Sequence, residues 1–322
     1  MTINIKSFST FPFIGMALDP IHIGTGGARL GRVDNTIVRD PVTRIPKIPG
    51  SSIAGVMRAY TAMAKGKYPD CAGIGKPNQS GGVGHCGKPD CPVCTVFGFA
   101  KGTGESGGFA GLAAFSDMHV LLFPVASQNG PQWITCPMEL RQSGITEFSD
   151  LGVLPEQQVI YRNTPQPSSL NLGWLFLEVK SGWNQLDIIT KKIKSLGIPD
   201  YINANLAVVS DKLFTHIVNS NLEVRTSVAI DPATGAAKEG ALFTYEALPR
   251  MTVLSGELTC RNPKHFKINN SEVEAAKSPE DVKDVVNGAF SYLEHLGIGG
   301  MGSRGMGRMK VLDIAKAEKE GH

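Results

Sequence analysis

The chain has 322 residues, of which 42% are hydrophobic and 19% are charged, and its formal net charge is +3. This composition is typical of a globular protein with one large core or two modest ones, and it excludes disordered and fibrous classes. No run approaches the roughly eighteen consecutive apolar residues that span a bilayer, and MTINIKSFST lacks a secretory leader pattern, so we expect a cytoplasmic protein without a membrane partner.

The first motif along the chain is IHIGTGGARLGRVDNTIVRD at residues 21–40. It has no Gly-Lys-Ser/Thr ending, so a mononucleotide P-loop is not predicted. Arg29 and Arg32 could instead clamp a phosphate backbone, and Asp34 could position a metal ion or accept a proton from a ribose 2′-hydroxyl. A loop aspartate is more often a turn or cap residue, and His22 is either an acid or base or a structural residue at a strand end.

Apolar residues spaced three and four apart predict three helices, at residues 51–64, 185–196 and from Ser278 to Leu296. Ser51 or Ser52 can cap the first helix. Ser278 can cap the third, which has proline and two acidic residues in its first turn.

Four of the six cysteines fall within 24 residues, at Cys71, Cys86, Cys91 and Cys94. Four soft ligands in a glycine-rich loop can close a tetrahedron around Zn²⁺, so a structural zinc site is predicted. His85 in place of Cys71 is an open alternative, and so are four unliganded thiols. Cys136 and Cys260 lie in apolar strand contexts and are expected to be buried.

Short runs of β-branched and aromatic residues predict the strands of a sheet beneath the helices, which indicates an α+β fold. These runs are LAAF, HVLLFPV, WLFLEV, NLAVV and TVLSGELTC. Residues 222–230 and 241–248 flank turn signals and predict a long projecting β-hairpin. Two long loops, at roughly 65–110 and 139–172, are expected to be functional or disordered.

The C-terminal run LGIGGMGSRGMGR at residues 296–308 matches GxGxxG literally. It follows a helix and leads into the last strand, so its context does not fit a dinucleotide fold. Bare backbone beside Arg304 and Arg308 favours a polyanion lying across the loop, and a flexible connector is the alternative.

The motifs in their order resemble the backbone subunit of type III CRISPR-Cas effector complexes, within the RAMP superfamily. The quoted pieces are PIHIGTGG, VDNTIVRD, IPKIPGSSIAGVMR, VFG, FSDMHVLLFPVAS, WITCP, IDPATGAAKEGAL and GIGGMGSRGMGR. The FPV and WITCP segments favour the Cmr type (III-B), whereas the cysteine loop is closer to the Csm type, so the subtype stays open.

The resemblance implies a single RAMP domain over 1–322, with an RRM-like (ferredoxin-like) palm, a thumb hairpin and inserted loops. The palm would comprise 1–64, 110–138, 173–222 and 248–315, with a zinc-binding insert at 65–109, a loop insert at 139–172 and the thumb at 223–247. It also implies repeated copies in a helical filament along a CRISPR RNA, with target RNA and other effector subunits as partners.

By the same resemblance, Asp34 matches the family's aspartate for metal-dependent cutting of target RNA at regular intervals, with a divalent cation such as Mg²⁺. Asp40 is the alternative carboxylate. The residues expected to bind RNA are His22, Arg29, Arg32, Lys47, Ser51, Ser52, Arg58, Gly299, Gly300, Arg304 and Arg308. The competing functions are a non-catalytic RNA-binding scaffold and, more distantly, a small-molecule enzyme that binds a nucleotide.

Overall fold

The protein is described here by a computed structural model, which covers residues 6–26, 33–73, 84–100, 107–146, 154–162, 167–180, 185–314 and 319–321. Its helices are α1 (Gly50–Ala64), α2 (Pro92–Phe97), α3 (Pro137–Gln142), α4 (Leu186–Ser195), α5 (Asp200–Ala204), α6 (Asp211–Ser220), α7 (Pro279–Asn287) and α8 (Phe290–His295). Two short 3₁₀ turns are η1 (Pro263–His265) and η2 (Gly302–Arg304).

The longer strands are β1 (Phe8–Ala17), β4 (Met118–Val125), β8 (Leu175–Lys180), β10 (Glu223–Ile230), β11 (Ala237–Ala247), β12 (Val253–Arg261) and β15 (Met309–Ile314). The shorter ones are β2 (Lys47–Ile48), β3 (Ala113–Phe115), β5 (Gln132–Thr135), β6 (Gln158–Tyr161), β7 (Ser169–Leu172), β9 (Leu206–Val208), β13 (Lys267–Ile268), β14 (Ser271–Glu272) and β16 (Lys319–Gly321).

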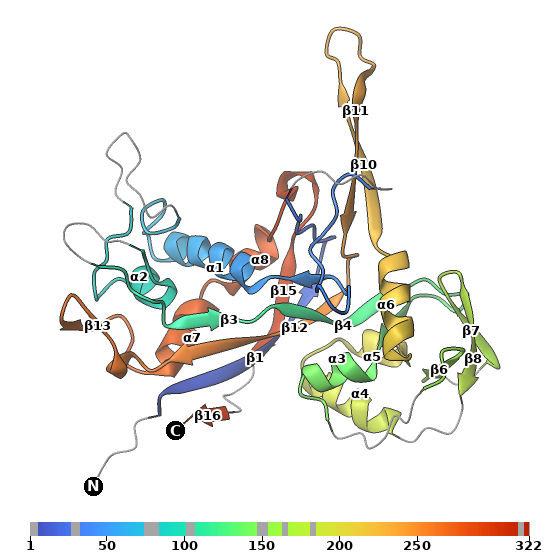
Figure 1. Cartoon of the computed structure of the whole chain (residues 1–322), viewed down its shortest axis with the longest axis horizontal. Helices are drawn as coiled ribbons and strands as arrows, with labels where there is room; N and C mark the ends of the chain where they lie inside the picture. The colour runs from blue at the N-terminus through green and yellow to red at the C-terminus, as the bar shows by residue number, and fades with distance from the viewer. Residues whose placement is uncertain are drawn as a thin grey trace.

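One mixed sheet runs along the molecule in the order β15-β1-β12-β4-β5-β9-β6-β8-β7 (Figure 1). Near one edge, β1 and β12 form an antiparallel pair that stays in register from Phe8 opposite Arg261 to Met16 opposite Val253. The β5–β9 and β6–β8 pairs are parallel. The sequence prediction of an α+β fold is therefore confirmed.

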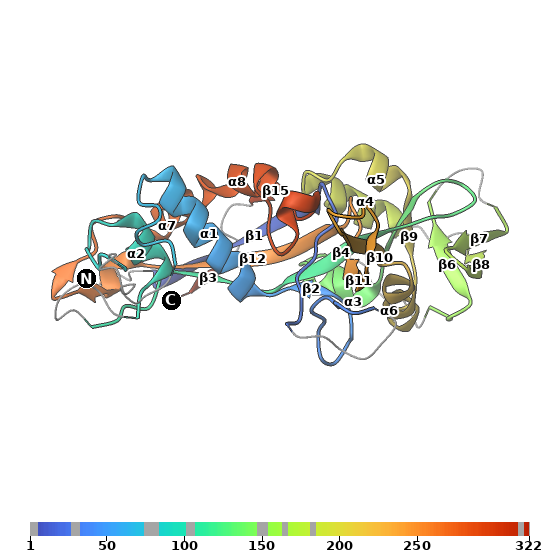
Figure 2. The same cartoon turned by 90° about the horizontal axis from the view of Figure 1, so that it is seen from above.

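The apolar residues form two principal clusters, the first of which extends from β1 to β7 and β8. In the first, α1, α7 and α8 pack with the central strands, and Phe13 of β1 contacts Phe290 of α8 with ring centroids 5.8 Å apart. In the second, Ile189 and Ile193 of α4 pack with Trp133 of β5. Seen from above, α1, α7 and α8 lie over one half of the sheet and α4 and α5 over the other (Figure 2).

Helix α1 forms where it was predicted, but its N-terminus is capped differently. Neither Ser51 nor Ser52 caps it; Pro49 is the N-cap residue, without a side-chain cap bond. The Gly50 N–H instead donates to Asp117 Oδ1 at 2.8 Å. A cap from a residue so far along the chain leaves no local signal, so the prediction of a serine cap was wrong.

The helix predicted after Ser278 begins as expected and then breaks. Ser278 and Asp281 form a reciprocal capping box, which confirms the N-terminal signal. Gly288 ends α7, and α8 starts again at Phe290, because glycine is a weak helix former and the second segment must turn its own apolar face to β15. Leu296 is 55% exposed, so its place in the buried stripe was predicted wrongly.

The segment expected to be a loop at 139–172 contributes to the sheet. Within its described residues, β6 pairs with β8 and β9, and β7 pairs with β8. β6 and β7 have only four residues each, too few for a clear alternation of apolar and polar side chains. This explains why the periodicity of the sequence did not predict them. The predicted β-hairpin is confirmed: β10 and β11 pair from Glu223 opposite Ala247 outward and project from the sheet (Figure 1).

Within the described ranges, no helix combines the length and the apolar character that crossing a bilayer requires.

Candidate nucleic-acid interface and metal centre

The two glycine-rich segments of the sequence meet at one place, which we call the junction: residues 20–24, residues 297–307 and the base of the β10–β11 hairpin. The Gly300 N–H donates to the His22 carbonyl at 2.9 Å, and the Gly307 N–H donates to the Pro20 carbonyl at 2.8 Å. The two segments therefore converge in the described part, while Gly27–Gly31 lie outside the described residues.

Close backbone approach at the junction requires glycine. Gly299 has a φ of +87°, and a Cβ there would lie 2.4 Å from the His22 carbonyl oxygen. Gly299 and Gly300 are exposed on the other side, so their main chain is open to a ligand. A side-chain-free surface of this kind lets a phosphate backbone reach peptide N–H groups.

His22 holds the junction together from inside. Its side chain is buried, its Nδ1 lies 2.6 Å from the Glu246 carbonyl oxygen, and its ring meets Tyr245 edge-on at 6.0 Å. These contacts tie the N-terminal segment to β11. The structural alternative for His22 therefore fits its placement better than the acid, base or RNA-contact alternatives.

Asp34 lies beside the hairpin and is exposed. Its Oδ2 accepts hydrogen bonds from the Thr244 backbone N–H and the Thr244 hydroxyl, each at 2.8 Å. These donors hold the pKa of the Asp34 carboxyl below its usual value. The side chain is thus ionised at neutral pH, and its Oδ1 has no hydrogen-bond partner within the described part of the chain.

Asp40 is placed quite differently from Asp34. Its Oδ1 accepts from the Thr43 backbone N–H at 2.8 Å and from the Val42 backbone N–H at 2.9 Å, which is the pattern of an Asx turn. Its other oxygen lies 3.8 Å from Lys47 Nζ. This geometry favours Asp34 as the carboxylate available to a ligand.

Lys47, the cation predicted to bind RNA next to the start of α1, is already paired with carboxylates. Lys47 Nζ lies 2.6 Å from Asp117 Oδ2, and the Lys47 side chain is only 17% exposed. Ser51 is exposed in the first turn, and Ser52 is half-buried. Asp117 pairs with Lys47 and also accepts a hydrogen bond from the Gly50 N–H. The start of α1 therefore offers less positive charge to a ligand than the sequence indicates.

On the C-terminal side, Arg304 and Arg308 differ in whether a carboxylate already binds their guanidinium group. Arg304 is exposed, with Nη1 3.4 Å from the Ser227 hydroxyl of β10. Arg308 makes two bonds to Asp19, Nε to Oδ2 at 2.5 Å and Nη2 to Oδ1 at 3.2 Å. Arg29 and Arg32 lie outside the described residues.

Sequence reasoning missed two arginines at the hairpin. Arg225 of β10 donates from Nη1 to the Gly305 carbonyl at 3.4 Å and so joins the glycine loop to the hairpin. Arg39 forms an ion pair with Glu246 at 2.8 Å and also donates to Asn219 and the Ile37 carbonyl. Arg225 and Ser227 lie two residues apart, on one face of a strand, and that alternation was the available signal.

The four cysteines of the predicted zinc site come together. The sulfur atoms of Cys71, Cys86, Cys91 and Cys94 all lie within 4.8 Å of one another, so this cluster could hold a metal ion. His85 is not a member of it, which favours Cys71 as the fourth ligand. Hydrogen bonds from the Cys94 thiol and from backbone amides lower the pKa of Cys91 to about 5, although burial opposes them.

Four sulfur ligands at this spacing fit Zn²⁺, which takes tetrahedral thiolate sites. Cys136 and Cys260 are fully buried outside the cluster, as predicted, and burial raises the pKa of Cys260 to about 12.

Arg58 does not face the junction. From α1 its Nη2 donates to the Gly98 carbonyl just after α2, and burial lowers its pKa. An RNA contact by Arg58 would require leaving this position, so its placement disfavours the predicted role.

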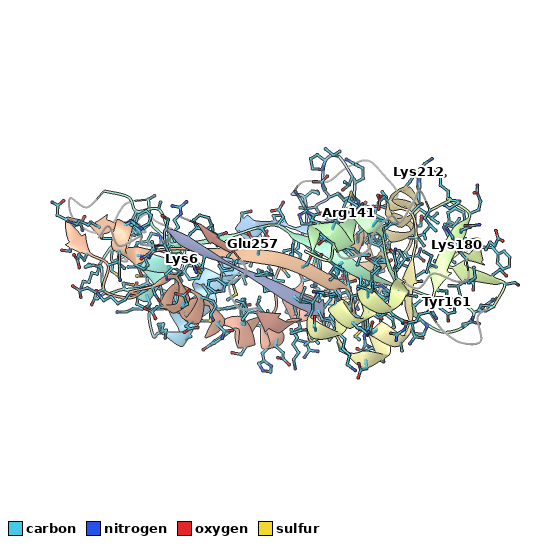
Figure 3. The ribbon with its side chains drawn as sticks, turned by 90° about the horizontal axis from the view of Figure 1, so that it is seen from below. Lys6, Arg141, Tyr161, Lys180, Lys212 and Glu257 are labelled. Carbon is cyan, nitrogen blue, oxygen red and sulfur yellow. The ribbon has the colours of Figure 1, made fainter. Side chains whose placement is uncertain are left out.

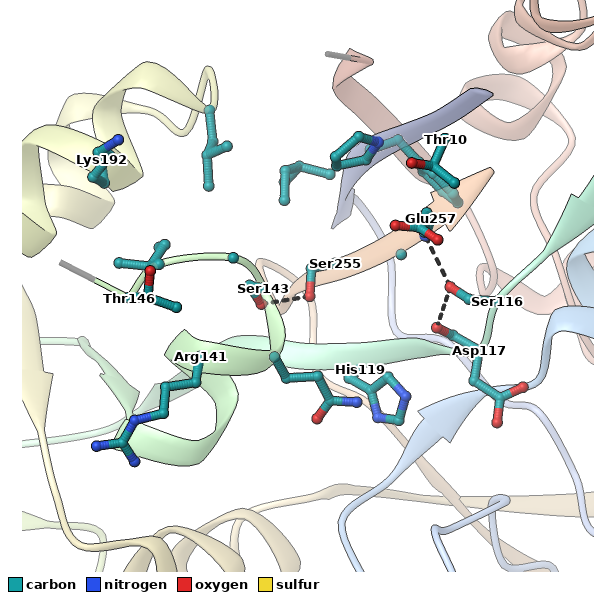
Figure 4. Close-up of a pocket in the computed structure, with 18 of the residues that line it drawn as sticks. Thr10, Ser116, Asp117, His119, Arg141, Ser143, Thr146, Lys192, Ser255 and Glu257 are labelled. Atoms are coloured by element: carbon teal, nitrogen blue, oxygen red, sulfur yellow. Dashed lines mark hydrogen bonds between the residues drawn. The ribbon is translucent and has the colours of Figure 1, made fainter. Parts of the chain in front are cut away.

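A separate hollow of about 660 Å³ is lined in part by Arg141 and Glu257, which are both labelled in Figure 3. It lies between β1, β12 and the α3–α4 region (Figure 4). Arg141 and Lys192 line one side of it, and Asp117 and Glu257 line the other (Figure 4). Among the residues that the structure describes, none of those predicted to bind RNA lines this hollow.

With this geometry in place, the chain can be compared with known proteins. The family model of the RAMP superfamily matches residues 16–310. This chain belongs to the RAMP superfamily. The RAMP protein is 25% identical to "CRISPR system Cmr endoribonuclease Cmr4" of Pyrococcus furiosus over 254 residues, which are 73% of this chain and 76% of the relative.

A second curated relative is "CRISPR system Cms endoribonuclease Csm3" of Methanothermobacter thermautotrophicus. It is 40% identical over 90 residues, which are 27% of this chain. The match spans only 32% of the length of that Csm3.

Solved structures agree in fold with this RAMP protein. A type III-B Cmr-beta structure bound to cognate target RNA aligns with a TM-score of 0.64 at 17% identity, covering 96% of this chain and 98% of that chain. A crystal structure of oligomeric Cmr4 from Pyrococcus furiosus aligns with a TM-score of 0.60 at 17% identity, covering 96% and 100%.

Proposed function

We propose that this RAMP protein is a repeated backbone subunit of a cytoplasmic type III CRISPR ribonucleoprotein that binds guide CRISPR RNA and cleaves complementary target RNA. The observation that carries the proposal is the junction, where exposed glycine backbone, the hairpin base and the ionised Asp34 come from distant parts of the chain. The names of the Cmr4 and Csm3 relatives, both endoribonucleases, support it.

RNA would lie across the junction. Gly299 and Gly300 are exposed and carry no side chain to block a phosphate backbone, while Arg304 and Arg225 supply positive charge beside them. Ser51 and Ser52 would contact the same strand at the start of α1. Lys47 and Arg308 would contribute only by exchanging their present carboxylate partners for phosphates.

The β10–β11 hairpin would act as the thumb of an RRM-like palm. Several of its apolar side chains are exposed, which suits insertion between bases of a guide–target duplex. These residues are Val224, Val228, Ile230, Leu242 and Phe243. Repeated copies along the guide, together with other effector subunits, would then place one junction at regular intervals along the target.

Asp34 would act on the target strand in its ionised form. Because its pKa is lowered by Thr244, the carboxylate is available at neutral pH to hold a cation or to accept a proton from a ribose 2′-hydroxyl. A divalent cation such as Mg²⁺ bound there would stabilise the charge that develops on the scissile phosphate. The cysteine cluster would hold a structural Zn²⁺ away from this chemistry.

One observation favours a second function, a non-catalytic scaffold. Asp34 Oδ2 accepts two hydrogen bonds from Thr244, as a carboxylate with a purely structural role would. No other exposed carboxylate bonds to Thr244 in the described chain, so Asp34 alone makes this link to the hairpin. In that case Asp34 would only fix the loop to the hairpin, and another subunit would cut the RNA.

Target cleavage by the assembled complex with Asp34→Asn separates the two functions. We expect the cleavage rate to fall roughly 10²- to 10⁴-fold, the usual contribution of a general acid or base, with guide and target binding unchanged. Asp40→Asn is the matched control, because asparagine can still accept the turn hydrogen bonds, and its rate should stay normal. A normal rate in Asp34→Asn would establish the scaffold function instead.

A further inference from the structure

Arg58 is a half-buried cation that has no carboxylate partner in the described chain. It stands on α1, and its Nη2 donates to the Gly98 carbonyl, while its Nε is buried without a hydrogen-bond partner there. Withdrawing a charged guanidinium from water is costly unless an opposite charge is close. The position of Arg58 therefore calls for an anion that is neither aspartate nor glutamate.

The cysteine cluster supplies that anion. Gly98, which accepts from Arg58, also donates its N–H to the Cys94 carbonyl at 3.0 Å, so the guanidinium sits at the end of the helix that carries Cys94. Cys94, Cys71 and Cys91 are the groups whose charge acts on Arg58. Four thiolates around a divalent ion carry more negative charge than the ion neutralises, so a neighbouring cation stabilises the loaded site.

We propose that Arg58 is the counter-ion of a metal–thiolate centre formed by Cys71, Cys86, Cys91 and Cys94, and that it ties α1 to this centre. The inference rests on the metal site of the proposed function. Arg58 is thus a positioning residue, which neither touches RNA nor ligates the metal. Its Nη2 bonds to the Gly98 carbonyl at the end of the helix that carries Cys94, which brings its charge to the cysteine lobe.

The link has a consequence for the RNA surface. α1 carries Arg58 about two turns after its start at Gly50, and its first turn holds Ser51 and Ser52, the residues proposed to meet the guide. Metal loading would fix α2, and α2 would fix α1 through Arg58. The metal would therefore support guide binding at a distance without contacting RNA.

Zinc affinity of the purified protein tests the proposal. Competition with a chromophoric chelator should show roughly 10- to 100-fold weaker zinc binding in Arg58→Met, the usual effect of removing a residue that supports metal ligands. Arg58→Lys, which keeps the charge, should recover part of the affinity. Arg261→Met, at an exposed end of β12, is the control and should bind zinc as the wild type does.

Cobalt substitution gives a readout that a merely structural role would not change. Co²⁺ in the cluster should show a thiolate charge-transfer band, and removing the nearby cation in Arg58→Met should shift it, while Arg261→Met leaves it in place. If Arg58→Met does not fold, Arg58→Lys and Arg58→Gln are compared by the same chelator competition, and equal zinc dissociation constants would reject the counter-ion role.

The outcomes separate this inference from the proposed function. Wild-type protein that binds no zinc would overturn both the metal site and the counter-ion role. Normal zinc affinity in Arg58→Met, combined with weaker binding of a short single-stranded RNA, would overturn the counter-ion role alone and return Arg58 to the RNA surface. Weaker zinc binding in Arg58→Met, with normal zinc binding in Arg261→Met, supports the proposal.

Discussion

The metal lobe and the junction are built in opposite ways. The lobe gathers four side chains from residues 71–94, a short stretch of chain, and their chemistry is visible in the sequence. The junction is made mainly of main chain from residues 20–24, 244–247 and 297–307, which only the fold brings together. Side-chain sites can therefore be located from spacing, whereas a backbone surface depends on the whole topology.

The largest effect should come from breaking the metal lobe. Cys94→Ser removes one of the four proposed ligands and leaves three thiols, two of them buried, without the proposed ion, so the free energy of unfolding should fall by well over the roughly 1 kcal/mol of an average substitution. Metal analysis of the purified protein should show the loss of bound zinc, and chemical denaturation should show the loss of stability.

Cys136→Ser is the matched control, since Cys136 is equally buried but lies outside the cluster. It should keep a full complement of zinc. Unchanged zinc content in Cys94→Ser would show that the four cysteines do not form the metal site.

At the junction, the corresponding change is a single methyl group. Gly299→Ala places a Cβ 2.4 Å from the His22 carbonyl and also holds alanine at a φ of +87°, so stability should fall by more than the about 1–2 kcal/mol cost of the left-handed conformation alone. Gly305→Ala, at a φ of +74° with nothing within 4 Å of its Cβ, isolates that cost. Equal unfolding free energies for the two variants would show that the close approach to His22 is not important.

The contrast also explains how far the sequence could be interpreted. Helices α1 and α4 and the hairpin were predicted because their signals are local: apolar spacing, turn residues and β-branched runs. The cap of α1 was not, because Asp117 reaches Gly50 from 67 residues away. The placement of Arg58 was missed for a similar reason. Its position on α1 does not say whether its side chain lies in solvent or bonds to Gly98, which is 40 residues away.

A smaller effect is expected where side chains support the backbone surface. Glu246→Gln leaves the Arg39 guanidinium without its carboxylate, and both side chains are about 15% exposed, so a loss of about 1.5–3 kcal/mol is expected for a charged hydrogen bond. Thermal and urea unfolding measure it. Arg225→Gln is the control, because the Arg225–Glu223 pair is more exposed and should matter less. A larger loss in Arg225→Gln would reverse this ranking of the two ion pairs.

The smallest effect concerns the pKa of Asp34. Its folded-state pKa is depressed, so the carboxylate stays ionised as pH falls until the pH passes below that pKa. Thr244→Val removes the hydroxyl donor but keeps the backbone N–H, so the pKa should rise only part of the way to its usual value. The acidic limb of the cleavage rate should then shift to higher pH, with the plateau at neutral pH unchanged, and NMR titration of the Asp34 carboxyl should show the same shift. Thr226→Val is the control for this change. Thr226 of the neighbouring strand β10 pairs with Thr244 but does not bond to Asp34, so the acidic limb of the cleavage rate should stay in place. A pKa shift without any change in the rate profile would mean that the ionisation of Asp34 does not control cutting, and the carboxylate would then belong with the structural contacts of the junction.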